Sequence, residues 1–331
     1  MVRKNRQIQI LILLLSLTIL PVFFYTDRYI MNILILCFIW SIVAASWDLI
    51  LGYANVFSFG HIAFFVIGGY SSGLLVNFLK ISPWIGILMG GIIASMIGLL
   101  IGLPCLKLKG IYLAIVTFSL LFVLPTLIVW AGPGRFKNFS TGGTYGLQKI
   151  LPPSLFGYTF TRSNLIPWYY LTFVFFITFL LIIYKIIHSS TGLALVALRD
   201  AEPLAKTLGI NDYKYKLLIF GISSFIAGIM GALYAHYFEA ISPANLGLNV
   251  FLITLVMVLF GGLGVFPGAV LGSFVITFTN ELLRPLLEWR LVVLGAIVII
   301  TMILMPKGLM GIPELFSNLK YYHSQKNRWG G

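Results

Sequence analysis

The amino-acid sequence predicts an all-α fold, a polytopic integral membrane protein built as a bundle of about ten transmembrane helices. Three observations favour this fold class. Hydrophobic residues make up 60% of the 331 residues and charged residues only 9%, whereas a soluble domain has about 25% charged residues. The mean hydropathy is +1.01. Apolar runs of roughly 20 residues, the length that crosses a bilayer core about 30 Å thick, recur along the chain. These observations exclude a soluble globular fold.

The expected spans are apolar runs that lie between charged residues and Pro, Gly or Asn breaks. The first run follows the basic start MVRKNRQ. Because no small-residue cleavage site follows it, we expect a retained span and not a signal peptide. In chain order the expected spans cover residues 8–24, 30–51, 56–79, 82–103, 111–130, 167–187, 215–238, 248–262, 265–283 and 290–305.

Each span ends at polar or helix-breaking residues. A long loop, about 131–166, follows the fifth span, and a charged segment, about 188–214, follows the sixth. The stretch GGLGVFPG, between the eighth and ninth spans, carries no charge. It is either a bend within the membrane or a loop at its surface.

Basic residues set the expected orientation, because Lys and Arg are enriched in cytoplasmic connections. With the N-terminus in the cytoplasm, fourteen of the 22 Lys and Arg residues fall on cytoplasmic connections. Both termini and the segment 188–214 then face the cytoplasm, and the loop 131–166 lies outside the cell. We expect one transmembrane domain over residues 1–331.

Other function classes find little support in the sequence. The net charge is +13, but the basic residues are scattered among connections instead of forming the basic stripe of a nucleic-acid-binding protein. Cys37 and Cys105 have no metal or redox spacing. The motifs H-E-x-x-H and G-x-S-x-G, zinc-type Cys/His clusters and closely paired carboxylates are absent from the sequence. We therefore expect no catalytic residue and no bound metal or cofactor.

Polar residues and glycines within the spans are candidates for a transport pathway or for helix packing. Ionisable groups at membrane depth are usually functional, and for His61 the alternatives are a place near a pathway and packing through a satisfied ring nitrogen. His236 is expected at the membrane interface. Glycines four residues apart are typical of close helix packing, and the alternative is that they let helices slide during transport. The candidates are Asp48, Gly60, His61, Gly69, Gly73, Gly261, Gly262, Gly264 and Gly268.

The stretch DAEPLAKTLGINDYKYK, residues 200–216, gathers six charged residues between two apolar spans. Asp200 is a good N-cap, Pro203 is tolerated in a first helical turn, and Gly209 is a natural left-handed stop. The stretch therefore predicts a helix of about two turns. Its apolar residues would share one face: Ala201, Leu204, Ala205 and Leu208.

So short a helix is marginal alone and needs to pack this apolar face on something. One interpretation is a helix that lies against its own bundle or the lipid headgroups. The other is a knob that inserts into a partner protein on the cytoplasmic side.

The longer stretch ALRDAEPLAKTLGINDYKYKLLIFGISSFIAG resembles the cytoplasmic loop of ABC importer permeases, in which an acidic residue, small residues and a glycine form the coupling helix that docks on the ATPase. The resemblance assigns the coupling role to Arg199, Asp200, Ala201, Glu202, Leu204, Ala205, Leu208 and Gly209. Other stretches resemble permeases of branched-chain amino acid importers, in particular the LivM-like family: LGYANVFSFGHIAFFVIGGY, GIYLAIVTFSL, STGGTYGL, MVLFGGLGVFPGAVLGSF and MPKGLMG.

The resemblance covers residues from about 45 to 312 and implies a type II ABC importer fold in a prokaryotic cell (inner) membrane. It implies a second related permease, two cytoplasmic ATPase subunits that use ATP, and an extracytoplasmic solute-binding protein. The sequence has no G-x-x-x-x-G-K-[ST] loop to bind nucleotide itself. The chain departs from the family at two positions. Asp48 stands where the family commonly has Asn, and Pro203 stands where the family has no proline. Because a carboxylate near the membrane can alter selectivity, the resemblance does not fix the substrate.

Two alternatives remain at this point. One is an ABC permease for urea or short amides. The other is an ion-coupled secondary carrier, which would use intramembrane acids or broken helices. Asp48 and the stretch GGLGVFPG leave room for a carrier. The predicted coupling helix discriminates against it, because a self-sufficient carrier has no need of a helix that docks on an ATPase.

Overall fold

The fold is that of a computed structural model of the chain. The structure describes residues 17–18, 20–21, 27–108, 110–133, 140–155, 157–287, 289–304 and 308–311. The predicted first span, 8–24, lies almost entirely outside these residues. The basic start and the chain beyond residue 311 also lie outside them.

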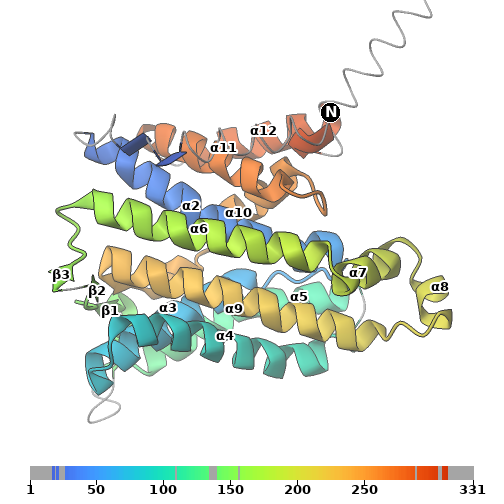
Figure 1. The fold of residues 1–331 in the computed structure, drawn as a ribbon, viewed down its shortest axis with the longest axis horizontal. Coiled ribbons are helices and arrows are strands. Elements are labelled where there is room, and N and C mark those ends of the chain that lie inside the picture. The colour runs from blue at the N-terminus through green and yellow to red at the C-terminus, as the bar shows by residue number, and fades with distance from the viewer. Residues whose placement is uncertain are drawn as a thin grey trace, which may run out of the picture.

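Long helices dominate the described chain (Figure 1). They are α2 (Arg28–Asp48), which continues as the π-helical segment η1 (Leu49–Tyr53), then α3 (His61–Leu79), α4 (Pro83–Cys105), α5 (Ile111–Trp130), α6 (Leu165–Ile187) and α9 (Asp212–Phe238). Shorter α-helices are α7 (Ser190–Asp200), α8 (Glu202–Thr207), α10 (Leu248–Gly261), α11 (Gly268–Leu282) and α12 (Trp289–Leu304).

Short elements complete the described chain. The 3-10 turns are η2 (Gly143–Tyr145), η3 (Pro243–Leu246), η4 (Arg284–Leu286) and η5 (Gly308–Gly311). The strands are β1 (Leu147–Gln148), β2 (Ser154–Leu155), β3 (Tyr158–Thr159) and β4 (Ala240–Ile241). They form two antiparallel pairs, β1 with β4 and β2 with β3.

Six described helices are long and apolar enough to cross a membrane: α2 with η1, α3, α4, α5, α6 and α9. They match the six predicted spans from 30–51 to 215–238. The predicted spans at 248–262, 265–283 and 290–305 form α10, α11 and α12, which have 14, 15 and 16 residues. At about 1.5 Å per residue these are shorter than a bilayer core of about 30 Å. A polytopic helical bundle is confirmed, but ten full-length spans are not confirmed in the described part of the chain.

Glycine lets α3, α4 and α9 pack with their backbones almost in contact. A Cβ atom on Gly68 of α3 would lie 2.1 Å from the carbonyl oxygen of Gly228 in α9. A Cβ atom on Gly90 of α4 would lie 2.6 Å from the carbonyl oxygen of Gly68. Small residues are what allow membrane helices to approach this closely. These three helices form the tightly packed lower part of the bundle in Figure 1.

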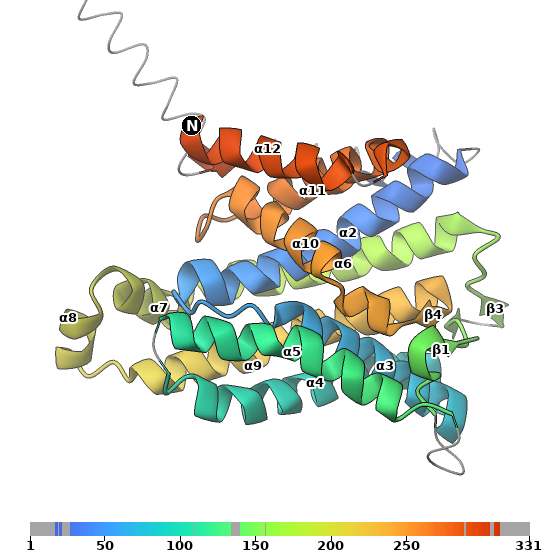
Figure 2. The same cartoon turned by 180° about the vertical axis from the view of Figure 1, so that it is seen from behind.

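A second group of helices, α2, α6, α10, α11 and α12, occupies the other side of the bundle (Figures 1 and 2). Phe38 of α2 is fully buried at its centre. Its ring lies 5.2 Å from that of Tyr169 and 5.4 Å from that of Phe173, both in α6, and 5.8 Å from that of Phe274 in α11. Edge-to-face and tilted contacts of this kind hold aromatic cores together.

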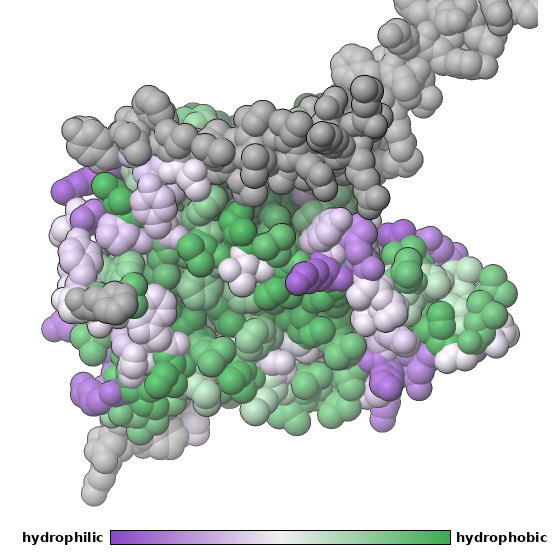
Figure 3. All heavy atoms as spheres, in the orientation of Figure 1, coloured by the Kyte–Doolittle hydropathy of each residue, from purple (hydrophilic) through white to green (hydrophobic). Residues whose placement is uncertain are grey.

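The bundle has two opposite ends with different structures. At one end lie the strands and the loop between α5 and α6, and at the other end α7 and α8 project beyond the long helices (Figure 1). Hydrophilic residues gather towards these two ends, and mostly apolar residues cover the middle of the face in Figure 3. An apolar middle between two polar ends is the surface that a bilayer requires.

His236 anchors the strand-bearing end. Its ring Nδ1 lies 2.7 Å from the carbonyl oxygen of Leu151, and its Nε2 lies 2.8 Å from the hydroxyl of Ser72. Because a carbonyl oxygen only accepts, Nδ1 donates to it, and Nε2 accepts from the hydroxyl. The side chain is fully buried. Both ring nitrogens therefore have protein partners that replace water, and the expected place at the membrane interface stays a prediction.

Candidate functional site: the projecting segment

The projecting segment, defined as residues 188–214, contains two helices instead of the one that the sequence predicts. Ser189 caps the start of α7, because its hydroxyl accepts a hydrogen bond of 3.5 Å from the backbone N–H of Gly192. Helix α7 runs to Asp200, where the backbone breaks at Ala201, and α8 follows over six residues. The prediction that Asp200 caps this helix is wrong. Its carboxylate accepts a hydrogen bond of 2.9 Å from Nε of Arg199, and Ala201 occupies the capping position.

The two ends of α8 follow ordinary helix chemistry. Pro203 lies in the first turn, where a missing N–H costs nothing. Gly209 has φ +86°, the left-handed conformation that the sequence predicts for the helix stop. Space is open where a Cβ atom on Gly209 would lie. Backbone conformation, and not crowding, therefore explains glycine at this position.

The predicted apolar face of α8 is divided between the protein and its surroundings. Ala205 is buried, with 2% of its surface exposed, whereas Leu204 is 62% exposed and Leu208 is 75% exposed. Ala201 is also exposed, and Leu193 of α7 adds a third leucine with 68% exposure. Packing against the chain's own bundle therefore accounts for Ala205 alone. The three leucines remain exposed on the projecting segment.

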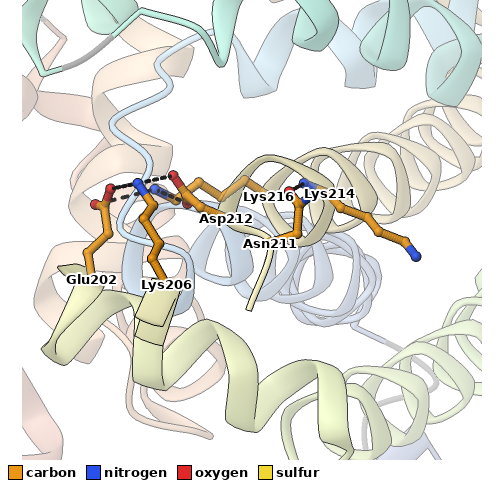
Figure 4. A network of polar contacts seen from close by, with 6 residues as sticks. All are labelled: Glu202, Lys206, Asn211, Asp212, Lys214 and Lys216. Carbon is orange, nitrogen blue, oxygen red and sulfur yellow. Dashed lines mark hydrogen bonds and ion pairs between the residues drawn. The ribbon is translucent and has the colours of Figure 1, made fainter. Parts of the chain in front are cut away.

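Four charged residues tie α8 to the start of α9 (Figure 4). Nζ of Lys206 lies 2.5 Å from Glu202 and 3.3 Å from Asp212, and Nζ of Lys216 lies 2.6 Å from Asp212 and 3.8 Å from Glu202. These contacts raise the pKa of Lys206, with the hydrogen bond to Glu202 as the largest cause. We call these four residues the ion-pair ring. Single exposed pairs contribute little to stability because water screens them, and a closed network positions a helix better than an isolated pair.

The ring fixes how α8 leaves the bundle. Asn211 caps α9, because its side-chain oxygen accepts a hydrogen bond of 3.0 Å from the backbone N–H of Lys214. The side chain of Lys214 extends away from the ring (Figure 4). Helix α8 is therefore held against a long helix of the bundle and presents its leucines outward.

The remaining predicted site residues lie in the bundle and pack closely. Asp48 is buried, and its Oδ1 accepts a hydrogen bond of 2.8 Å from the backbone N–H of Gly264. Gly261 and Gly268 face each other, since a Cβ atom on Gly261 would lie 2.2 Å from the carbonyl oxygen of Gly268. Gly262, with φ +106°, begins the turn that joins α10 to α11.

The other predicted residues lie in α3 or directly before it. His61 is fully buried, its Nε2 lies 3.0 Å from Oγ of Ser46, and its ring stacks on Trp47. Gly60 precedes it and leaves room for Leu120 of α5. The same helix meets the strand-bearing end through Gly69 and Gly73. A Cβ atom at either position would collide with a side chain from the strands.

Three parts of this arrangement were not predicted from the sequence. Lys216 closes the ion-pair ring, and its spacing of four residues from Asp212 was the available signal. Leu193 joins the exposed leucines from a different helix. Gly52, in η1, contacts Gly264, because a Cβ atom on Gly52 would lie 2.2 Å from the backbone nitrogen of Gly264. No sequence signal connects residues so far apart.

An apolar cavity of about 210 Å³ opens beside the start of α10. It is lined by α5, η3 and the residues that lead into α10: Leu121, Phe122, Pro125, Pro243, Leu246, Gly247 and Leu248. The backbone of η3 is not α-helical at this point.

A polytopic helical bundle, close glycine-mediated helix packing and an apolar middle between two polar ends define a multi-pass membrane protein. The chain belongs to the family described as branched-chain amino acid transport system / permease component, whose model matches residues 29–302.

Curated relatives agree with this assignment. The chain is 27% identical to the high-affinity branched-chain amino acid transport system permease protein LivM of Escherichia coli (strain K12) over 308 residues, 87% of this chain and 71% of the relative. It is 24% identical to the corresponding protein LivH of Salmonella typhimurium over 294 residues, 83% of this chain and 92% of the relative. It is 26% identical to a probable LivM permease of Methanocaldococcus jannaschii over 281 residues, 74% and 78% of the two chains. No solved structure matches the chain.

Proposed function

We propose that this chain is the transmembrane permease subunit of an ATP-driven ABC importer for branched-chain amino acids. Its family, and relatives named as LivM and LivH permeases, support this function. The chain forms part of the transport pathway and performs no catalysis. ATP is bound by separate subunits, because the sequence lacks the phosphate-binding loop that such subunits carry.

The exposed leucines of the projecting segment carry the proposal most directly. Leu204, in the six-residue helix α8, and Leu208, at its C-cap, are each more than half exposed. A helix this short gains most of its stability from packing, and the ion-pair ring holds it so that these side chains point outward. We infer that they insert into an apolar groove on an ATPase subunit. The type II importer arrangement has two such subunits beneath two permeases.

The second permease in this proposal is a related but distinct chain. Matches to both LivM and LivH relatives support a paired system, because each is named as a permease of a branched-chain amino acid transport system. The two permeases would enclose the pathway between them. An extracytoplasmic binding protein would dock at the strand-bearing end and deliver the solute.

The proposed orientation follows from the two ends of the bundle. The projecting segment would face the cytoplasm of a prokaryotic cell, together with both termini, and the strand-bearing end would face outward. Basic residues support this arrangement, since Lys206, Lys214 and Lys216 lie on the proposed inner side. ATP binding would close the ATPase pair, move the projecting segment and change the side to which the pathway opens.

Transport by the assembled complex tests this function. The chain, its sister permease, the ATPase subunits and the binding protein are reconstituted in vesicles, and uptake of labelled leucine, isoleucine and valine is measured. We expect uptake that requires ATP and persists after proton and sodium gradients are collapsed. Uptake of urea or short amides alone would replace the substrate assignment. Uphill uptake by this chain alone, powered by an ion gradient, would replace the importer assignment with a secondary carrier.

A further inference from the structure

Arg199 extends from the projecting segment into the helix bundle. Its Nη1 donates a hydrogen bond of 3.3 Å to the carbonyl oxygen of Gly52, in η1 at the end of α2. Its Nε donates to the neighbouring Asp200. The side chain of Arg199 is 30% exposed, against 60% for Asp200. Arg199 therefore differs from the exposed leucines, because its guanidinium contacts the bundle and not the surface that faces a partner.

Two glycines let the guanidinium reach its place. A Cβ atom on Gly264 would lie 2.4 Å from Nη1 of Arg199, and a Cβ atom on Gly52 would lie 2.2 Å from the backbone nitrogen of Gly264. A methyl group at either position would displace its neighbour. The guanidinium, the end of α2 and the turn between α10 and α11 are consequently in direct contact.

The same turn, residues 262–267, is bonded to the end of α2 on its other side. The backbone N–H of Gly264 donates to the Asp48 carboxylate at 2.8 Å, and the backbone N–H of Phe266 donates to the hydroxyl of Tyr53 at 2.9 Å. The side chains of Arg199 and Asp48 therefore flank Gly264, and two hydrogen bonds attach this turn to the end of α2.

Helix α10 extends from this turn to the apolar cavity. Its last residue, Gly261, directly precedes the turn, and its first residue, Leu248, lines the cavity of about 210 Å³ beside α5. A helix of 14 residues behaves as a stiff rod over this distance. Displacement of the turn would therefore displace the cavity wall.

We propose that Arg199 is the positioning residue that transmits movement of the projecting segment to the α10–α11 turn, and through α10 to the cavity beside α5. This inference rests on the proposed function. It assigns Arg199 a role different from docking on the ATPase, because its contacts face the bundle. Coupling between distant sites requires such a physical connection with two arrangements that both sites can bias.

Substitution of Arg199 tests the connection in the complete complex. Arg199→Met removes the charge and the hydrogen bond but keeps a long apolar stem, and Arg199→Lys restores the charge. Lys214→Met is the matched control, because Lys214 belongs to the same segment and its side chain extends away from the ion-pair ring. Uptake of labelled leucine per ATP hydrolysed is the measurement, on complexes whose assembly is checked by gel filtration.

We expect Arg199→Met to lower uptake per ATP about tenfold, the usual size of coupling between two sites. Arg199→Lys should recover part of the loss, and Lys214→Met should match the wild type. Wild-type coupling in Arg199→Met, or an equal loss in Lys214→Met, would overturn the proposal. If the wild-type complex itself shows no ATP-driven uptake, it is the proposed importer function that fails.

If the complex with Arg199→Met does not assemble, a measurement on the wild-type complex tests whether the turn moves with the projecting segment. Hydrogen exchange is compared between the nucleotide-free complex and the complex trapped with a non-hydrolysable ATP analogue. We expect exchange at the backbone amides of Gly264 and Phe266 to change at least about fivefold, because the turn moves with the projecting segment. Equal exchange in the two states would overturn the proposal.

Discussion

The carboxylate of Asp48 accepts a hydrogen bond of 2.8 Å from the backbone N–H of Gly264, which joins the end of α2 to the turn between α10 and α11. A buried acid in a membrane helix is a usual candidate for ion coupling. Here the carboxylate has a backbone partner within its own chain. Asp48 therefore has a structural role, because its side-chain oxygen holds the turn at Gly264.

Replacement of Asp48 separates its hydrogen bond from its charge. Asp48→Asn keeps an oxygen that accepts from Gly264, whereas Asp48→Leu leaves that buried N–H without its partner, at a cost of about 1–3 kcal/mol. We expect thermal unfolding in detergent to show a lower Tm for Asp48→Leu than for Asp48→Asn. Equal losses in the two variants would mean that the charge, and not the hydrogen bond, stabilises this turn.

Gly52 should not tolerate a side chain. A Cβ atom there would lie 2.2 Å from the backbone nitrogen of Gly264, so Gly52→Ala should lower the free energy of unfolding by about 1–3 kcal/mol. Gly295→Ala in α12 is the control, because space is open around that position. The control should be neutral or slightly stabilising, since alanine favours helix. A tolerated Gly52→Ala would show that the two backbones are further apart than described.

The ion-pair ring should matter for coupling more than for folding. Glu202→Lys places a third positive charge beside Lys206 and Lys216, and we expect it to reduce solute-stimulated ATP hydrolysis by the complex while membrane insertion persists. The double variant Glu202→Lys with Lys206→Glu restores one opposite pair and should recover part of the stimulation. Full stimulation in Glu202→Lys alone would show that the orientation of α8 does not depend on the ring.

The sequence predicts the fold where one physical signal dominates. Six long apolar helices follow from hydropathy, because a bilayer core admits few other structures. The stop at Gly209 follows from backbone conformation. Helix α11 begins at Gly268, later than the predicted start at residue 265, because an apolar run next to glycine and proline does not reveal where its helix begins.

The rest of the candidate site depends on contacts between residues far apart in the chain. Asp200 is a favourable N-cap by residue type, but its carboxylate accepts a hydrogen bond from the neighbouring Arg199 instead of capping the helix. The contact of Arg199 with Gly52 spans 147 positions, and that of Asp48 with Gly264 spans 216. Local pattern carries no information about such pairs. Exposure of Leu204 and Leu208 likewise becomes visible only when the bundle is assembled.

The most direct test concerns those two leucines. The affinity of the purified ATPase subunit for the permease pair is measured with wild-type chain, with Leu204→Ser/Leu208→Ser and with the control Lys214→Ser. Both leucines are exposed, so the double variant should fold normally. We expect at least about a tenfold weaker affinity for the double variant, because it loses two apolar anchors, and no change for the control. Equal affinity in all three proteins would contradict this prediction.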